Sequence, residues 1–208
     1  MNEIAIIDYG VGNLRSVERA FAATGNPAIV SSDESVLREA RGLVLPGVGA
    51  FATCMTELAT RGFDTLVRWH VIEGKPLLGI CVGMQMLFEE SGEFGGASGL
   101  GLIRGRVRRF PRQLLVPQVG WNQIRQRCQH PVFSGVQDEA FCYFVHSYYC
   151  EAADQTIVLG ETEYGVTYPS VIAHRDLLGV QFHPEKSQAV GLQLLRNFAH
   201  RVRFRVWQ

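Results

Sequence analysis

The sequence has 208 residues, of which 47% are hydrophobic and 19% are charged, so it can bury the core of a globular domain. Its 20 Lys and Arg residues balance its 20 Asp and Glu residues, which gives no reason to expect a nucleic acid or an anionic membrane as a partner. Its five cysteines include no C-x-x-C pair, which argues against a disulfide framework and against a metal site.

Short apolar runs alternate with helical patterns through the first half of the chain. Leu14, Val17 and Phe21 recur at helical spacing, and Gly25 closes that helix. A second helical pattern covers residues 51–73. This alternation indicates βαβ units and a parallel sheet. The strands are expected at residues 4–8, 28–30, 42–47 and 77–81.

The second half of the chain is dominated by strand patterns. They run from about residue 98 to residue 182, separated by short turns, and predict an antiparallel elaboration on the same sheet. The last helix is expected to start near Ser187, a residue type suited to an N-cap. Its predicted buried stripe is Leu192, Leu195, Phe198 and Val202.

We therefore expect an α/β protein with a three-layer, open, mostly parallel mixed sheet and helices on both faces. Residues 1–208 show no repeat and no linker, so a single domain is expected. The apolar N-terminal run is too short for a signal peptide, and no stretch approaches the roughly 18 apolar residues of a membrane span. A cytoplasmic location is the expectation.

A cysteine lies between two glycines where a strand is predicted to become a helix. Gly79, Cys81 and Gly83 form a G-x-C-x-G motif, the cysteine counterpart of the nucleophile elbow of hydrolases. The turn residue of such an elbow projects from the carboxyl edge of the sheet, where open α/β folds bind ligands. The helix N-terminus favours a thiolate there, and the Val82 N–H can donate to an oxyanion.

A histidine suited to serve this cysteine follows a later strand. Leu178, Val180 and Phe182 alternate with period two, so His183 is placed where that strand leaves the sheet. Pro184 keeps His183 extended, so Glu185 can reach the imidazole and fix its tautomer. This arrangement predicts a Cys-His-Glu triad. The rival histidines, His146 and His174, are interpreted as hydrogen-bonded strand residues.

Six motifs in order, spread over residues 4–198, together resemble class I glutamine amidotransferases. They are more closely similar to the glutaminase subunits of imidazole glycerol phosphate synthases, which act in histidine biosynthesis. This resemblance implies a flavodoxin-like fold, no cofactor and the hydrolysis of glutamine to glutamate and ammonia. The motifs are DYGVGNL (8–14), PGVGAF (46–51), GICVGMQ (79–85), VPQVGWN (116–122), YFVHSYY (143–149) and HPEKS (183–187).

The resemblance implies a role for each residue of the triad. Cys81 would attack the side-chain amide of glutamine. His183 would protonate the departing ammonia and then activate water to hydrolyse the γ-glutamyl thioester, with Glu185 orienting it. The oxyanion would be held by the Val82 N–H and by the backbone of the loop from Gly47 through Val48 to Gly49.

Strain in that loop is a further expectation. In the family, a peptide near Val48 is thought to flip to complete the oxyanion hole. A non-glycine residue at positive φ costs about 1–3 kcal/mol, which would keep the enzyme idle until a partner compensates.

The resemblance also implies which residues bind the amino-acid end of the substrate. Gln85 lies one helical turn after Cys81 and would bind that end. Glu93 matches a position that pairs with the α-ammonium group, and the peptides at Ser147 and Tyr148 match a loop that meets the α-carboxylate.

The partner implied is a separate (βα)8-barrel cyclase subunit, docked over the glutaminase site in a heterodimer. It would use the ammonia to form imidazole glycerol phosphate and AICAR from the phosphoribulosyl-formimino nucleotide PRFAR. Gln118 stands where the family often has histidine, which bears on docking. The expected interface residues are Tyr9, Gly12, Asn13, Trp121 and Asn122.

Three alternatives compete with this interpretation. A glutaminase could serve another acceptor, such as one in pyridoxal phosphate, purine or anthranilate synthesis, but the DYGVGNL and GWN motifs argue against it. A catalytically silent binding subunit would not need Cys81, His183 and Glu185 intact. A peptidase or deglycase of related topology would lack the HPE and PGVG motifs in this arrangement.

Overall fold

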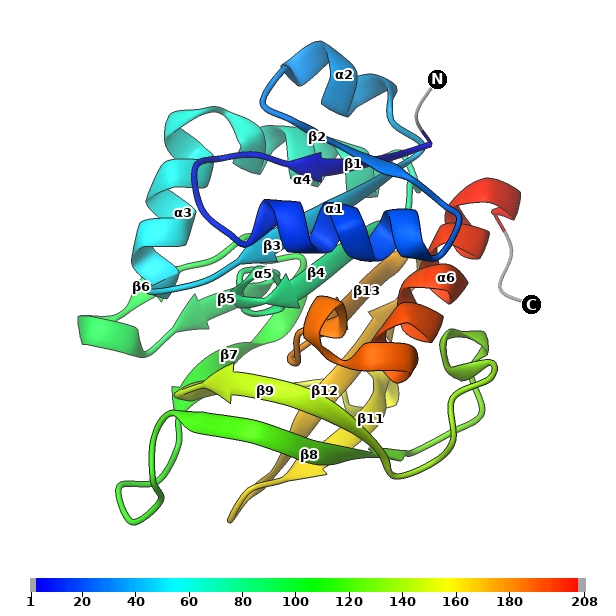
Figure 1. Ribbon diagram of the computed structural model, residues 1–208. Coiled ribbons are helices and arrows are strands. Elements are labelled where there is room, and N and C mark those ends of the chain that lie inside the picture. Colours follow the sequence, from blue (N-terminus) through cyan, green and yellow to red (C-terminus); the bar gives the residue numbers. More distant parts are fainter. Residues whose placement is uncertain (1–2, 206–208) are drawn as a thin grey trace.

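The computed structural model describes residues 3–205, and its larger sheet has the strand order β2-β1-β3-β4-β13-β12-β11-β8-β9 (Figure 1). The first five strands of this order run parallel: β2 (Ala28–Ser31), β1 (Ile4–Ile7), β3 (Gly42–Gly47), β4 (Leu77–Cys81) and β13 (Leu177–Val180). The other four are added antiparallel: β12 (Thr167–His174), β11 (Val158–Glu163), β8 (Gln118–Gln126) and β9 (Ala140–His146). The expected α/β fold with a mixed sheet is confirmed.

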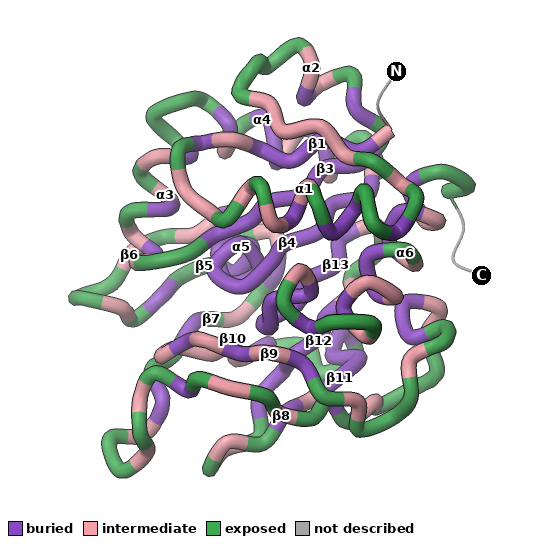
Figure 2. The backbone as a smooth tube through the Cα atoms, in the orientation of Figure 1, coloured by how far each residue is buried: buried purple, intermediate pink, exposed green. Residues whose placement is uncertain are grey.

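Helices cover both faces of the parallel strands. Helices α1 (Leu14–Ala23) and α6 (Gln188–Phe204) pack together on one face, with α3 (Phe51–Thr60) and α4 (Phe63–Ile72) on the other (Figure 1). All residues of β1, β3 and β4 are buried, as their continuous apolar sequences predict for strands covered on both sides. Figure 2 shows this buried layer between the exposed outer turns of the helices.

The predicted helix over residues 51–73 is wrong, because two helices occupy this segment. Gly62 separates α3 from α4 and has φ = 73°, a left-handed conformation that ends one helix and opens the next. The structure also contains a short helix that the sequence analysis did not predict, α2 (Glu34–Glu39). Asp33 caps it by accepting a hydrogen bond from the Ser35 amide at 2.8 Å.

The antiparallel elaboration expected over residues 98–182 is wrong in two respects: β13 runs parallel to β4 inside the large sheet, and some of the other strands form a separate sheet. A second sheet has the order β10-β7-β5-β6 and lies beside the carboxyl end of β4 (Figure 1). Its strands are β10 (Tyr148–Ala152), β7 (Ile103–Arg109), β5 (Phe88–Ser91) and β6 (Ala97–Ser98). Strand β9 of the large sheet and β10 of the small sheet are joined by Ser147 alone. The alternation of apolar residues identified the strands, but it does not specify which sheet each one joins.

Helix α6 follows Ser187, as predicted, although Ser187 does not cap it through its side chain. The Ser187 hydroxyl instead donates to the His183 carbonyl at 2.7 Å and accepts from the Tyr143 amide at 3.0 Å. Leu195, Phe198 and Val202 are buried as predicted, whereas Leu192 is only partly buried. Residues 1–2 and 206–208, which the predicted domain includes, lie outside the described part. Every helix within residues 3–205 is too short or too polar to cross a membrane.

Candidate active site

Strand β4 ends at Cys81 and turns directly into a one-turn helix, α5 (Val82–Gln85). Cys81 has φ = 54° and ψ = −113°, a conformation that costs a non-glycine residue about 1–3 kcal/mol. The turn is too tightly packed for side chains on either side of it. A Cβ atom at position 83 would lie 1.9 Å from the Leu45 carbonyl oxygen, and one at position 79 would lie 2.8 Å from the Gly83 oxygen. The structure therefore has the strained elbow that the G-x-C-x-G motif predicts.

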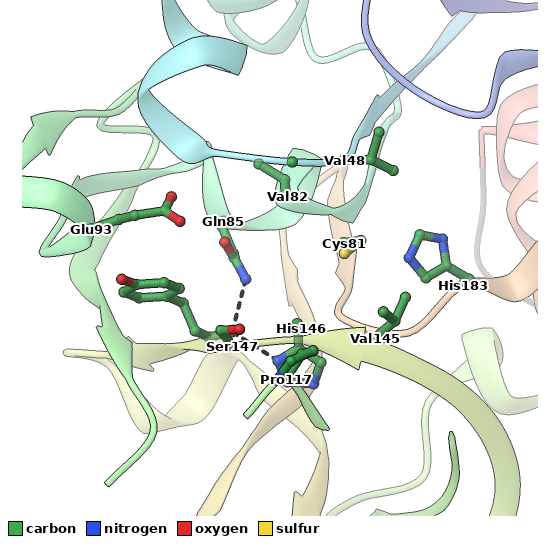
Figure 3. Close-up of a pocket in the computed structure, with 12 residues that line it drawn as sticks. Val48, Cys81, Val82, Gln85, Glu93, Pro117, Val145, His146, Ser147 and His183 are labelled. Atoms are coloured by element: carbon green, nitrogen blue, oxygen red, sulfur yellow. Dashed lines mark hydrogen bonds between the residues drawn. The ribbon is translucent and has the colours of Figure 1, made fainter. Parts of the chain in front are cut away.

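A cavity of about 260 Å³ opens beside Cys81, at the carboxyl end of β4. In Figure 3 the Cys81 sulfur and the His183 ring lie at one end of this cavity and Glu93 at the other, with Gln85 between them. The lining residues are Val48, Gly49, Cys81, Val82, Gln85, Glu93, Pro117, Val145, His146, Ser147, Tyr148 and His183. Most of the predicted site residues are thus brought together from distant parts of the chain.

His183 and Glu185 form a buried ion pair behind the cavity wall. Nδ1 of His183 lies 2.8 Å from Oε1 of Glu185, and the side chains are 4% and 1% exposed. Burial alone would lower the pKa of His183, but the neighbouring Cys81 sulfur and the hydrogen bond to Glu185 raise it to about 10. The shift favours the protonated imidazole, which lies between the Cys81 sulfur on one side and the Glu185 carboxylate on the other.

The backbone around His183 is held on both sides. Its amide donates to the Tyr143 carbonyl on β9 at 2.9 Å, and the 3₁₀ turn Pro184–Lys186 follows it directly. The two rival histidines have other surroundings. His146 lines the cavity, but its Nδ1 is 2.8 Å from the Tyr148 carbonyl, and burial lowers its pKa to about 4. His174 is exposed at the end of β12.

The loop expected to form the oxyanion hole lies beside the sulfur. Gly47 is buried and pairs with Cys81 in the β3–β4 register, without lining the cavity, whereas Val48 and Gly49 line it. The positive φ in this loop belongs to Gly49, at 85°, while the strained non-glycine residue of the site is Cys81. Among the non-glycine residues that line the cavity, the backbone strain is therefore at Cys81 and not at Val48. The Val48 carbonyl accepts a hydrogen bond from the Cys54 thiol at 3.3 Å.

Tyr9 supports the same loop from inside the protein. It was expected at a partner interface, but it is 0% exposed, so its side chain does not lie on the surface. Its hydroxyl donates to the Pro46 carbonyl at 2.6 Å, immediately before the loop. Tyr9 lies two residues after the end of β1, and its hydroxyl also lies 3.9 Å from the Met86 sulfur, so its side chain is part of the core.

The far end of the cavity combines amide and carboxylate groups. The Gln85 Nε2 donates to the Tyr148 carbonyl at 2.9 Å, an interaction drawn in Figure 3. Glu93 faces the cavity and accepts a hydrogen bond from the Phe51 amide at 2.6 Å, at the start of α3. Ser147 also lines this end. The Glu93 carboxylate suits the cationic group of a small ligand, whereas the N–H groups of Gln85 are used within the protein.

The other expected interface residues differ in exposure. Trp121 is 46% exposed and packs edge-on against Tyr143, with ring centroids 6.0 Å apart. Asn13 is exposed, whereas Gly12 and Asn122 are half-buried, and the Asn122 side chain donates to the Glu163 carbonyl at 2.8 Å. Gln118 is 3% exposed and accepts from the Tyr168 hydroxyl at 2.9 Å. Gln118 therefore lies in a buried hydrogen-bond network and not on the surface where a partner would dock.

The fold and this site define an amidotransferase of the class I type. The family model for class I glutamine amidotransferases matches residues 5–202, and the chain belongs to this family. It is 49% identical to imidazole glycerol phosphate synthase subunit HisH of Symbiobacterium thermophilum over 202 residues, covering 97% of this chain and 95% of that one. It is 48% identical to the subunit of the same name from Geobacter sulfurreducens, covering 95% and 98%.

Solved structures share the fold at lower sequence identity. A crystal structure of a glutamine amidotransferase superposes with a TM-score of 0.76 at 21% identity, covering 96% of this chain and 98% of that chain. The structure of PurLQS from Thermotoga maritima gives a TM-score of 0.74 at 16% identity, covering 96% and 99%. The expected class I amidotransferase fold is thereby confirmed.

The sequence analysis missed several residues around the sulfur. Gln181 is fully buried, and its Nε2 points to the Cys81 sulfur at 3.8 Å. Cys54 lies one helical turn into α3, where its thiol reaches the Val48 carbonyl. One signal for Gln181 was available in the sequence, because it is a polar residue within the apolar strand pattern of residues 177–183. Burying a polar side chain costs free energy unless it has a hydrogen-bond partner, so a partner was to be expected.

Proposed function

We propose that this protein hydrolyses glutamine through Cys81, His183 and Glu185 and delivers the ammonia to a synthase partner in histidine biosynthesis. The observation that carries the proposal is the cavity itself. It has the Cys81 sulfur and His183, whose pKa is raised, at one end, and Gln85 and Glu93 at the other. A glutamine side chain placed along it would present its carboxamide to the sulfur and its α-amino group to Glu93.

The first half-reaction consumes the proton of His183. The Cys81 sulfur attacks the carboxamide carbon and forms a C–S bond, while the carbonyl oxygen becomes an oxyanion beside the Val82 and Val48–Gly49 backbone. The C–N bond then breaks, and the leaving nitrogen takes the proton from His183 to depart as ammonia. Once the sulfur is acylated, it no longer holds the imidazolium, so the raised pKa of His183 falls and the proton transfer is favoured.

The second half-reaction restores the starting state. Neutral His183 removes a proton from water, whose oxygen attacks the thioester carbon. The C–S bond breaks, which releases glutamate and leaves the Cys81 thiolate beside a protonated His183. Glu185 keeps the imidazole in one tautomer and orientation through both steps because its carboxylate holds Nδ1.

The partner follows from the relatives and from the exposed surface. The relatives are named as subunits of imidazole glycerol phosphate synthase, which supports a heterodimer with a (βα)8-barrel cyclase that converts PRFAR to imidazole glycerol phosphate and AICAR. Trp121, exposed on β8, suits an aromatic anchor at that interface. We place the protein in the cytoplasm as one domain, an assignment that the free cysteines and the single buried core of the described residues support.

Glutamate release by the purified chain tests the proposal, alone and with a cyclase subunit and its nucleotide. Wild type should produce glutamate, with a rate that rises strongly in the complete mixture, and Cys81→Ala should produce none while still binding the cyclase. Ammonia should replace glutamine for the Cys81→Ala complex. A near wild-type rate in Cys81→Ala would overturn the nucleophile assignment, and full activity without the cyclase would overturn the coupling.

A further inference from the structure

Gln181 lies between the end of β13 and His183 and is 0% exposed. Its backbone amide donates to the Ser170 carbonyl on β12 at 3.0 Å, which fixes the position of the residue. Its side chain reaches in two directions: the Oε1 atom is 3.0 Å from the Gln85 Nε2, and the Nε2 atom is 3.8 Å from the Cys81 sulfur. Gln181 thus links the substrate end of the cavity to the sulfur.

The orientation of the Gln181 amide is determined by its neighbours. The Tyr148 carbonyl can only accept, so Gln85 must present its NH₂ group to it. The same NH₂ group faces Gln181, which must therefore present its oxygen. This arrangement leaves the Gln181 NH₂ group directed at the Cys81 sulfur.

A buried amide donor is stable only with an acceptor, and here the acceptor is the sulfur. A neutral thiol accepts hydrogen bonds weakly, whereas a thiolate is a charged acceptor. The contact is therefore stronger when the sulfur is ionised. Because Gln181 and Cys81 are buried, water does not weaken the preference of the N–H group for the thiolate over the neutral thiol.

We propose that Gln181 is a further catalytic residue. It donates a side-chain N–H to the Cys81 thiolate and so stabilises it together with His183. The inference rests on the proposed function of Cys81 as the nucleophile. Gln85 acts through Gln181 as a positioning residue, because it holds the amide with its nitrogen toward the sulfur. Removal of the donor destabilises the ionised sulfur without removing any group from the glutamine-binding end.

The test measures the ionisation of the sulfur and turnover separately. Alkylation of Cys81 by iodoacetamide is followed across pH by mass spectrometry of the peptide that carries it. In Gln181→Met, similar in size but without a donor, the rate at pH 7 should fall about tenfold and the pH midpoint should rise, since a hydrogen bond to a charged group is lost. The kcat for glutamine should fall, and KM should change less, because Gln85 loses its contact with Gln181 but keeps its hydrogen bond to the Tyr148 carbonyl.

A second variant and a matched control make the outcome decisive. Gln181→Glu keeps an acceptor for Gln85 but places a carboxylate beside the sulfur, so its midpoint should rise further. Ser170→Ala alters a neighbouring buried polar side chain whose hydroxyl has no hydrogen-bond partner, and it should leave alkylation unchanged. Folding of each variant is checked by thermal unfolding.

The two proposals fail in different ways. Wild-type reactivity and kcat in both Gln181 variants would overturn the role of Gln181 while leaving Cys81 as the nucleophile. If Cys81 in the wild type reacts no faster than the exposed Cys128, the nucleophile assignment itself is overturned.

Discussion

His183 and Glu185 are two residues apart in the chain, and their Nδ1 and Oε1 atoms lie 2.8 Å apart, almost completely shielded from water. The intervening Pro184 opens a 3₁₀ turn that brings both side chains to the same side. Since the second carboxylate oxygen, Oε2, has no hydrogen-bond partner in the structure, the imidazole is the main group that stabilises this buried charge.

Replacement of Glu185 by glutamine should lower both the pKa of His183 and the rate. The carboxylate is one of the groups that raise the pKa of His183 to about 10 against the effect of burial, so NMR titration should give a lower value in Glu185→Gln. The kcat should fall at least about tenfold, because a charge-assisted hydrogen bond is lost. Lys186→Gln changes the exposed neighbouring residue and serves as the control. An unchanged titration would contradict the assignment of Glu185.

Tyr9 and Cys54 should affect turnover through the loop that they hold. Their side chains donate to the carbonyls of Pro46 and Val48, on either side of Gly47. Tyr9→Phe and Cys54→Ala should each lower kcat with little change in KM, and Tyr9→Phe should lower the free energy of unfolding by about 1 kcal/mol. The two effects should be non-additive in the double variant, because both act on one loop.

The control for this loop removes a similar hydrogen bond elsewhere. Tyr164→Phe deletes a hydroxyl that donates to the Leu115 carbonyl at 2.9 Å, away from the cavity, and should leave kcat unchanged. Equal losses of kcat in Tyr164→Phe and Tyr9→Phe would show that the effect is general destabilisation.

Gly83→Ala should be poorly tolerated even though alanine favours helices. Its Cβ would lie 1.9 Å from the Leu45 carbonyl oxygen, so β3 and α5 would have to separate. We expect a loss of more than about 2 kcal/mol in urea unfolding, together with lost glutaminase activity. Gly92→Ala is the matched control, because its Cβ would make an ordinary contact at 3.7 Å with the Val107 oxygen. Equal stability of the two variants would exclude the packing explanation.

The buried His70 should make the protein less stable in acid. Burial lowers its pKa to about 4 from an ordinary value of 6.5, so the unfolded chain binds a proton that the folded chain excludes. This contribution to stability is complete above pH 6.5 and is lost as the pH falls towards 4. His70→Gln retains an N–H donor for the Pro76 carbonyl, which lies 3.1 Å from the His70 Nε2. Its unfolding free energy should fall less steeply between pH 7 and pH 4.5.

The exposed His174 on β12 provides the comparison for this pH dependence. His174→Gln should keep the wild-type slope, because it changes an exposed side chain and leaves the buried His70 in place. Identical slopes in wild type and His70→Gln would rule out His70 as the source of acid sensitivity.

Local patterns were sufficient to predict the elbow and four of the five parallel strands, whereas β13 was expected in the antiparallel part. Gly79 and Gly83 flank Cys81 because a Cβ atom at either position would clash with nearby backbone. The apolar runs of β1, β3 and β4 are stable only as strands buried on both faces. His183 and Glu185 are also a local pair, so the triad needed only one long-range contact, that between β4 and β13.

What the sequence could not predict depends on long-range contacts. Gln181 meets Cys81 and Gln85 across 100 and 96 residues of sequence, and its amide orientation follows from a carbonyl on yet another strand. Tyr9 was assigned to the surface because its motif borders a predicted interface, whereas tertiary packing turned the ring inward. Strand patterns specify faces and not partners, so the second sheet was missed.

The single-residue junction at Ser147 has a mechanical consequence. The small sheet is attached at this point to the edge of the large one, and the next residue supplies the carbonyl that accepts from both Gln85 and His146. A change in the backbone at this junction would therefore affect both contacts, which lie at the wall of the cavity. A bound glutamine analogue should therefore slow amide hydrogen exchange along β10 and β7 as well as at the elbow.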